Sequence, residues 1–185
     1  MSETEKPLEQ VTDYVTGEIV PNIGAEANRQ AVERFLVEEK GWQREQIKVD
    51  APFEFTINGI LYPAVLDLLI CCQGRQMIAI KCCAGSLLSR EREILAAARV
   101  CTAYQVPYAI VCDGLNAIVM DTLTGEQLGQ AMSAIPARHD VENRLGTYCF
   151  RPLAAKRSHG EKLIFRSYDS MNINVRRRSS VTDTS

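Results

Sequence analysis

Asp67 and Lys81 are the two residues of this sequence whose types and surroundings best suit chemistry. Both lie in the stretch LDLLICCQGRQMIAIKCCAG, where Asp67 is the single acidic residue and Lys81 ends an apolar run. A carboxylate supplies the oxygen ligands that Mg²⁺ prefers. A metal held there can stabilise charge on a phosphate or activate a water molecule, and a nearby lysine adds positive charge. The pair is a candidate phosphodiester-hydrolysis site, and two ordinary buried strands are the alternative.

Ala79 stands two residues before Lys81, where a second carboxylate would complete such a site. Residues two apart on a strand share a face, so an acid–x–lysine triplet directs both groups at one metal. A methyl group cannot bind Mg²⁺. Three explanations stay open: catalysis has been lost and binding kept, the sequence is an inactivated mutant, or another acid reaches the same point.

The helix expected after the Lys81 strand offers such an acid. At 100° per residue, Ile94 and Ala98 define the inward face of that helix. Glu91 lies about 60° from Ile94 on the side of Ala98 and should point inward, whereas Glu93 lies about 100° away on the other side and should point outward. Glu91 is the predicted substitute ligand. Its alternative role is a first-turn carboxylate favoured by the helix dipole, after Ser89 as the cap.

Other reactive residue types have structural alternatives. Arg29 could contact a phosphate, pair with Glu26 or lie on the surface. His139 and His159 fall outside the core and are expected at the surface. The stretch AGSLLSRERE places a glycine and two serines before a helix. Such residues at the start of a helix could hold a phosphate oxygen.

The cysteines form two adjacent pairs, Cys71–Cys72 and Cys82–Cys83, among seven in total. Adjacent strand residues point to opposite faces, whereas zinc ligands are usually two to four residues apart. The N-terminal stretch MSETEKPLEQ is polar and acidic, unlike a secretory signal, so disulfides are not expected. We interpret these cysteines as small buried hydrophobic residues.

Periodicity indicates the elements that position the candidate pair. The stretch GAEANRQAVERFLVEEKGW has apolar residues at helical spacing and ends at Gly41. QIKVD and FEFTI alternate as half-buried strands do, and Asn58–Gly59 predicts a hairpin into ILYPAVLDLLICC. Pro63 requires the start, an edge or a bulge of that strand. QMIAIKCC is the next buried strand.

The second half of the chain predicts a crossover. A helix lies between the strands at 76–83 and 106–112, which implies a locally parallel pair in a mixed sheet. NAIVMDT is a further strand, and LTGEQLG is polar and rich in turn residues. ARHDVENRLGTY and EKLIFRSYDSMNI are expected to form short helices.

Composition limits the functional classes. With 46% hydrophobic and 24% charged residues and no apolar run long enough to span a bilayer, a folded cytoplasmic domain is expected. The net charge of −2 does not favour nucleic-acid binding by the whole chain, although a local patch could bind. The one basic cluster is Arg176–Arg178, expected to be a solvated end.

The order of elements, with LDLLI and MIAIK across a hairpin, resembles the PD-(D/E)xK restriction-endonuclease-like superfamily. It is most similar to the N-terminal nuclease domain of type I restriction enzyme R subunits, through AEANRQAVERFL, Asp67, AIK and VPYAIVCDGLNAIVMDTLTG, over roughly residues 22 to 130. The resemblance implies an α/β fold with a mixed central sheet flanked by helices. It also implies that Asp67 is a metal ligand, Lys81 the catalytic lysine and Glu26 a first-helix acid that helps hold metal or water.

The resemblance divides the chain into an arm (1–21), a restriction-endonuclease-like core (22–135), a helical extension (136–175) and a disordered tail (176–185). The expected function is a Mg²⁺-dependent nuclease-like domain that acts on or binds DNA, with Asp67, Lys81 and Glu91 at the site. The alternative is an inactive domain of the same fold that binds nucleic acid or a partner protein, which Ala79 favours. A third is a structural module that forms a homodimer.

Overall fold

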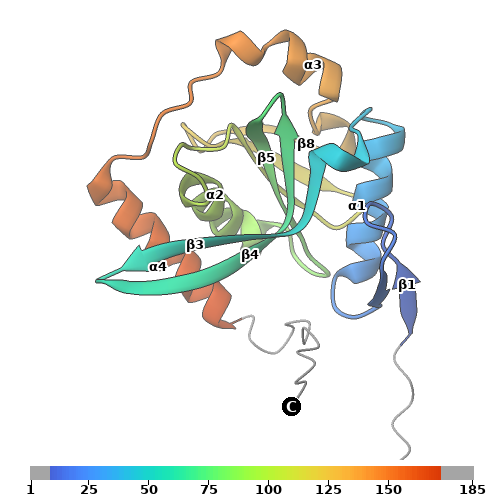
Figure 1. Ribbon diagram of the computed structural model, residues 1–185, viewed down its shortest axis with the longest axis horizontal. Helices are drawn as coiled ribbons and strands as arrows, with labels where there is room; N and C mark the ends of the chain where they lie inside the picture. The colour runs from blue at the N-terminus through green and yellow to red at the C-terminus, as the bar shows by residue number, and fades with distance from the viewer. Residues whose placement is uncertain (1–8, 172–185) are drawn as a thin grey trace, which may run out of the picture.

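The computed structural model describes residues 9–171, and its centre is a six-stranded sheet flanked by helices (Figure 1). The strands are ordered β3-β4-β5-β6-β7-β8. Their bounds are β3 Ile47–Ile57, β4 Ile60–Cys72, β5 Arg75–Cys82, β6 Tyr108–Cys112, β7 Ala117–Asp121 and β8 Gln127–Gln130. Neighbours are antiparallel except β5 and β6, which run parallel and are joined through helix α2 (Glu91–Val100). The predicted α/β fold and its parallel pair are confirmed.

Helices cover both faces of the sheet. Ile94 of α2 and Phe165 of α4 (Ala155–Met171) belong to the core on one face. Leu36 of α1 (Glu26–Glu38) and Val141 of α3 (Arg138–Asn143) belong to the core on the other. Short 3₁₀ turns are η1 Arg44–Gln46, η2 Leu88–Arg90, η3 Met132–Ala134 and η4 Leu145–Thr147. Within residues 9–171, no helix is both long and apolar enough to cross a bilayer.

The hairpin of β3 and β4 follows its sequence signals closely. Asn58 and Gly59 both adopt positive φ, at 50° and 80°, as a two-residue hairpin turn requires. Pro63 pairs with Glu54, whereas β4 begins to pair with β5 only at Leu68. Pro63 therefore lies where β4 forms the edge of the sheet, and its missing N–H leaves no gap in the ladder.

Each strand of this hairpin switches its buried side chains from one face of the sheet to the other, β3 at Asp50 and β4 at Asp67. On one side of this point the alternating apolar residues pack beneath α1, and on the other side the same alternation packs beneath α2 and α4. The flanking residues are Ile47 and Ala51 in β3, and Leu68 and Leu66 in β4. Asp50 has φ of 46°, a left-handed conformation that kinks a strand. The far half of the hairpin therefore turns toward α4, as Figure 1 shows.

Several sequence predictions need correction. The arm before α1 is not loose throughout, because β1 (Gln10–Thr12) and β2 (Ile19–Pro21) form a two-stranded sheet. QIKVD and FEFTI are one strand, β3, and the turn-rich stretch LTGEQLG includes the first three residues of β8. The last predicted helix begins earlier than expected, at Ala155. The predicted disordered tail, 176–185, lies outside the described residues.

Candidate active site

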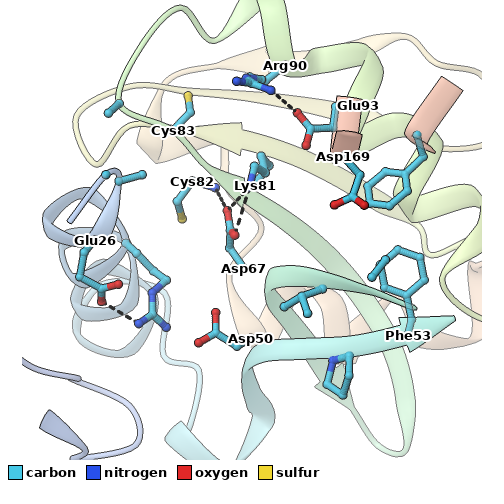
Figure 2. Close-up of a pocket in the computed structure, with 18 of the residues that line it drawn as sticks. Glu26, Asp50, Phe53, Asp67, Lys81, Cys82, Cys83, Arg90, Glu93 and Asp169 are labelled. Carbon is cyan, nitrogen blue, oxygen red and sulfur yellow. Dashed lines mark hydrogen bonds and ion pairs between the residues drawn. The ribbon is translucent and has the colours of Figure 1, made fainter. Parts of the chain in front are cut away.

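Asp67 and Lys81 lie side by side on β4 and β5 and form an ion pair (Figure 2). Lys81 Nζ is 3.1 Å from Asp67 Oδ2 and donates a hydrogen bond to Oδ1 at 3.2 Å. The backbone N–H of Cys82 donates to Asp67 Oδ2 at 2.7 Å. The side chains of the pair are 23% and 21% exposed, so both remain within reach of solvent. The two residues chosen from the sequence are thus brought together at the surface of a pocket.

The charge on Lys81 is stabilised by its neighbours. Burial lowers the pKa of its ammonium group, but the carboxylates of Asp67 and Glu93 outweigh burial and raise the pKa of Lys81 above its usual value. A lysine that holds its proton this firmly cannot serve as a general base at neutral pH. It can attract a phosphate or stabilise a developing negative charge.

Ala79 belongs to the core and not to the pocket. Its side chain is fully buried among Ala97 and Ala98 of α2 and Val111 of β6. A longer side chain at this position would have to displace the packing of α2 on the sheet. Any second carboxylate of the site must therefore come from another element.

Glu93 is the carboxylate that α2 contributes to the pocket. It is 3% exposed, and Arg90 Nη1 donates a hydrogen bond to its Oε2 at 2.9 Å. Glu91 is half-buried and is not among the described residues that line the pocket. The prediction that Glu93 points outward is therefore wrong. The helical wheel assumed one buried face, but α2 is covered by the sheet on one side and by α4 on the other.

Helix α4 is fixed to α2 by a buried glutamate. Glu161 receives Arg99 Nη1 on Oε1 and Arg92 Nη2 on Oε2, both at 2.7 Å. This double contact fixes the position of α4 along α2. One turn and two turns further on, Phe165 and Asp169 line the pocket. The C-terminal part of the described chain therefore supplies a wall of the site.

Glu26 lines the pocket and belongs to a buried ionic cluster around Arg29. Arg29 Nη2 is 2.6 Å from Glu26 Oε1 and 2.8 Å from Asp13 Oδ2, and Arg29 Nη1 is 3.0 Å from Glu33 Oε1. Gln30 also donates to Glu26 at 2.8 Å. Of the three roles considered for Arg29, the structure supports pairing with Glu26, and its 3% exposure excludes the surface role.

Burial favours the protonated form of Glu33 in this cluster. Burial raises the pKa of its carboxyl group to about 8, because it outweighs the attraction of Arg29, and the charge of Asp13 raises it further. The pKa of Asp13 is lowered although burial opposes this, because the backbone of Thr16 and the charge of Arg29 favour its ionised form. The cluster thus ties the β1–β2 hairpin to α1.

Asp50 is a pocket residue that the sequence gave no reason to select. The β3–β4 register places Val49 opposite Leu68 and Ala51 opposite Leu66, so Asp50 faces Asp67 across the two strands. Its charge also contributes to raising the pKa of Arg29, against the effect of burial. Figure 2 shows its carboxylate directed into the space between Glu26 and Asp67. A left-handed residue within a strand has no period-two signature, so the pattern could not reveal it.

These side chains surround one open pocket of about 950 Å³ (Figure 2). Its charged lining has six carboxylates against three cations. The carboxylates are Glu26, Asp50, Glu54, Asp67, Glu93 and Asp169, and the cations are Arg29, Lys81 and Arg90. The pocket has the size of a small-ligand or nucleotide site. Asp169 is in turn paired with Arg166, whose Nη1 lies 3.0 Å from Asp169 Oδ2, so part of this negative charge is already compensated.

The remaining sequence candidates add no charged side chain to the pocket, although Cys82 and Cys83 line it. All seven cysteines are free thiols; the Cys82 and Cys112 sulfurs are 3.9 Å apart, and this contact together with burial raises the pKa of the Cys82 thiol. His139 and His159 are exposed, as predicted. Ser89 does not cap α2, because its Oγ donates to the Ser86 carbonyl at 2.7 Å. Within residues 9–171, no three His, Cys, Asp or Glu side chains converge closely enough to hold a metal unaided.

Comparison with known protein families assigns the chain to one family. The family model described as type I restriction enzyme R protein N terminus matches residues 24–136, which is more than half of the chain. The chain belongs to this family. No curated protein and no solved structure matches it.

The pocket is lined partly by residues inside the matched region, 24–136, and partly by residues outside it. Asp50, Asp67, Lys81 and Glu93 lie within residues 24–136. The β1–β2 hairpin and α4 lie outside it, although Asp13 holds Arg29 and Asp169 lines the pocket. The site of this chain therefore combines the R protein N-terminal core with a wall added by later residues.

Proposed function

We propose that this chain is a nuclease-like domain of the PD-(D/E)xK type that acts on DNA with Mg²⁺. The observation that supports the proposal best is the Asp67–Lys81 pair, held 3.1 Å apart on neighbouring strands beside the buried Glu93 carboxylate. Glu93 takes the place that the sequence assigned to Glu91. Membership in a restriction enzyme family supports DNA as the substrate.

The residues present fit a magnesium ion. Mg²⁺ in phosphoryl-transfer sites is usually held by one or two carboxylates, with water and substrate phosphate as the other ligands. Asp67 and Glu93 would supply the two carboxylates. When bound, the ion would stabilise charge on the scissile phosphate and lower the pKa of the attacking water.

The protein side chains have separate roles in this proposal. Asp67 and Glu93 would hold the metal, and the N–H of Cys82 fixes the Asp67 carboxylate at 2.7 Å. Lys81 keeps its positive charge beside the phosphate. Arg90, which donates to Glu93 at 2.9 Å, lies at the pocket wall, where it can bind a neighbouring phosphate.

Cleavage of DNA by purified protein in Mg²⁺ tests this function. Asp67→Asn and Glu93→Gln should each lower the rate by roughly 100-fold or more, as removal of one electrostatic stabiliser does in other enzymes. Glu91→Gln is the matched control, because it removes the same charge from the same helix outside the pocket lining. Wild-type protein without cleavage in Mg²⁺ or Mn²⁺, or equal rates for Asp67→Asn and wild type, would contradict the proposal.

A second candidate is an inactive domain of the same fold that binds DNA or a partner protein. Ala79 favours it, because the strand position that would carry the second acid is a methyl group buried in the core. Calorimetry with Mn²⁺ separates the two. Heat that disappears in both Asp67→Asn and Glu93→Gln supports a metal site, and absence of heat from the wild type supports the binding function.

A further inference from the structure

Helices α2 and α4, which cover the same face of the sheet, carry more basic than acidic residues. With histidine counted as neutral, they hold six lysine and arginine residues against four aspartate and glutamate residues. The basic residues are Arg92, Arg99, Lys156, Arg157, Lys162 and Arg166, and the acidic residues are Glu91, Glu93, Glu161 and Asp169. The net charge of the whole chain is −2, so this helical layer differs in sign from the chain as a whole.

The two signs of charge in this layer differ in their exposure to solvent. All four acidic residues are buried or half-buried, and Glu93 and Glu161 are each only 3% exposed. By contrast, Lys156 and Arg157 are exposed, and the side chain of Arg92 is 41% exposed. The layer therefore presents mainly cations to solvent. We call Arg92, Lys156 and Arg157 the basic surface.

Glu161 does not neutralise the arginines that surround it. Its carboxylate oxygens lie 2.7 Å from Arg99 Nη1, 2.7 Å from Arg92 Nη2 and 3.9 Å from Arg157 Nε. Three guanidinium groups thus share one negative charge. Burial lowers the pKa of Arg99, and the charges of Arg157 and Arg92 lower it further, against the attraction of Glu161. An anion that binds at the two exposed guanidiniums relieves this repulsion.

The basic surface lies next to the pocket. On α2, Arg92 directly precedes the pocket residue Glu93. On α4, the pocket residues Phe165 and Asp169 follow Glu161 by four and eight positions, which is about 6 and 12 Å along the helix axis. Successive phosphates of one DNA strand are about 3.4 Å apart along the duplex axis. A strand whose scissile phosphate lies in the pocket therefore has other phosphates, a few nucleotides away, within reach of this surface.

The pocket alone offers little attraction to a polyanion. Each of its three cations already pairs with a carboxylate: Arg29 with Glu26, Lys81 with Asp67 and Arg90 with Glu93. Affinity of a protein for DNA comes largely from lysine and arginine side chains that neutralise backbone phosphates. A metal ion in the pocket would contact the scissile phosphate, so the flanking phosphates need cations that lie outside the pocket.

We propose that the basic surface binds the DNA backbone, with Arg92, Lys156 and Arg157 on phosphates that flank the scissile one. The position of the scissile phosphate rests on the proposed function, whereas binding of DNA by this surface can be tested without cleavage. Phosphate contacts carry no base information, so this binding is independent of sequence. Because α4 lies outside residues 24–136, the surface adds to what the R protein N-terminal core provides.

The first experiment measures binding of a labelled DNA duplex to the full chain by fluorescence anisotropy, in EDTA so that no metal and no cleavage are involved. Lys156→Gln with Arg157→Gln should weaken binding roughly tenfold or more at about 50 mM salt. The slope of log K against log salt concentration should become shallower by about two, because each lost phosphate contact removes about one.

A matched pair of variants controls for net charge. Arg34→Gln with Arg44→Gln removes the same two positive charges from exposed positions outside α2 and α4, and should leave the salt slope unchanged. Lys156→Arg with Arg157→Lys keeps both charges and should bind DNA like wild type. Arg176–Arg178 are present in every variant, so their contribution is the same throughout.

Arg92→Gln tests the part of the basic surface that α2 supplies. Arg99 still pairs with Glu161 at 2.7 Å in this variant, so α4 keeps an anchor on α2. Binding of DNA should weaken several-fold, with a salt slope shallower by about one. Urea denaturation checks that the variant remains folded.

The outcomes separate this proposal from the nuclease proposal. If wild type binds DNA, the Lys156–Arg157 variant loses affinity and no cleavage occurs in Mg²⁺ or Mn²⁺, the basic surface is upheld and the nuclease proposal fails. If wild type cleaves DNA and the Lys156–Arg157 variant cleaves with unchanged KM, the nuclease proposal stands and the basic surface is wrong. Absence of DNA binding by wild type, or equal losses in the Lys156–Arg157 and Arg34–Arg44 variants, would also overturn it.

An acidic protein is the other partner that such a surface could fit. Labelled polyglutamate is the probe for this alternative, used in the same buffer as the duplex. If polyglutamate binds wild type, Lys156→Gln with Arg157→Gln weakens it and DNA does not bind, the surface recognises acidic protein segments and the proposal is wrong.

Discussion

Two ionic assemblies lie within one region of this protein and differ in almost every physical respect. Around Arg29, three carboxylates surround one guanidinium, and all four side chains are at most 4% exposed. Around Lys81, the Asp67 pair is more than one-fifth exposed and faces an open pocket. The first assembly is buried and ties the β1–β2 hairpin to α1. The second keeps its charges available, which is what chemistry requires.

Burial decides which assembly contributes more to stability. Removing one partner of a buried charge network leaves the others without compensation, at a typical cost of several kcal/mol. An exposed pair is screened by water and contributes little. The same types of residue therefore have a structural role in one place and form a candidate reactive site in the other. We call the buried structural cluster of Asp13, Glu26, Arg29 and Glu33 the clamp.

The largest expected effect is on the clamp. Arg29→Met should lower the free energy of unfolding by about 3–5 kcal/mol, because the carboxylates of Asp13 and Glu26 lose their shared cation while remaining buried. Denaturation in urea measures this loss. Arg34→Met is the control on the same helix, since Arg34 is 61% exposed and its pair with Glu38 spans 3.6 Å. Equal effects of both substitutions would remove the contrast between the two assemblies.

The pocket should show the opposite balance. Lys81→Met should lower the proposed DNA cleavage rate by roughly 100-fold, while the free energy of unfolding falls by only about 1 kcal/mol. Parallel rate and urea measurements on one preparation check both numbers. A stability loss as large as that of Arg29→Met would mean that Lys81 is a structural cation and would weaken its assignment to the site.

The sequence revealed the pocket pair but not the clamp, for identifiable reasons. Asp67 and Lys81 lie on strands joined by a tight turn, so local periodicity is enough to place them together. For Arg29 the sequence offered pairing with Glu26 as one of three roles, but it gave no sign of the second partner, Asp13, which comes from a hairpin with little periodic signal. Helix α1 itself was predicted well, since its apolar residues and Gly41 are local signals.

Glu93 and Asp50 show where local patterns fail. The helical wheel of α2 assigned Glu93 to solvent because the helix that covers this side, α4, lies 60 or more residues later in the sequence. Glu161 anchors α4 on α2 through Arg92 and Arg99. Asp50 was missed because it adopts a left-handed conformation within a strand, which the alternating pattern does not reveal. Both misses concern groups that the tertiary structure, and not the local sequence, brings to the pocket.

A smaller effect should appear as a pH dependence of the clamp. The pKa of Glu33 is raised from 4.5 to about 8 on folding. The folded state therefore holds a proton that the unfolded state releases, and stability is full below pH 4.5 and falls as pH rises toward 8. The slope is at most about 1.4 kcal/mol per pH unit for one proton.

Glu33→Gln isolates this contribution. Glutamine cannot ionise, so the difference in unfolding free energy between variant and wild type should shift in favour of the variant between pH 5 and pH 8. Urea melts at intervals of one pH unit provide the measurement. A constant difference across this range would show that Glu33 is already ionised in the clamp.

The smallest expected effect concerns Asp50, which lies between the two assemblies and contributes both a backbone kink and a charge. Asp50→Ala should cost about 1 kcal/mol of unfolding free energy, because alanine is strained at φ of 46°. Asp50→Asn keeps the tolerated conformation and removes the charge opposite Asp67, so it should be neutral or slightly stabilising. If both variants lose the same stability, the carboxylate itself is needed there, and Asp50 belongs with the buried clamp. If only alanine destabilises, the contribution of Asp50 to stability is its backbone conformation, and its carboxylate belongs with the open pocket.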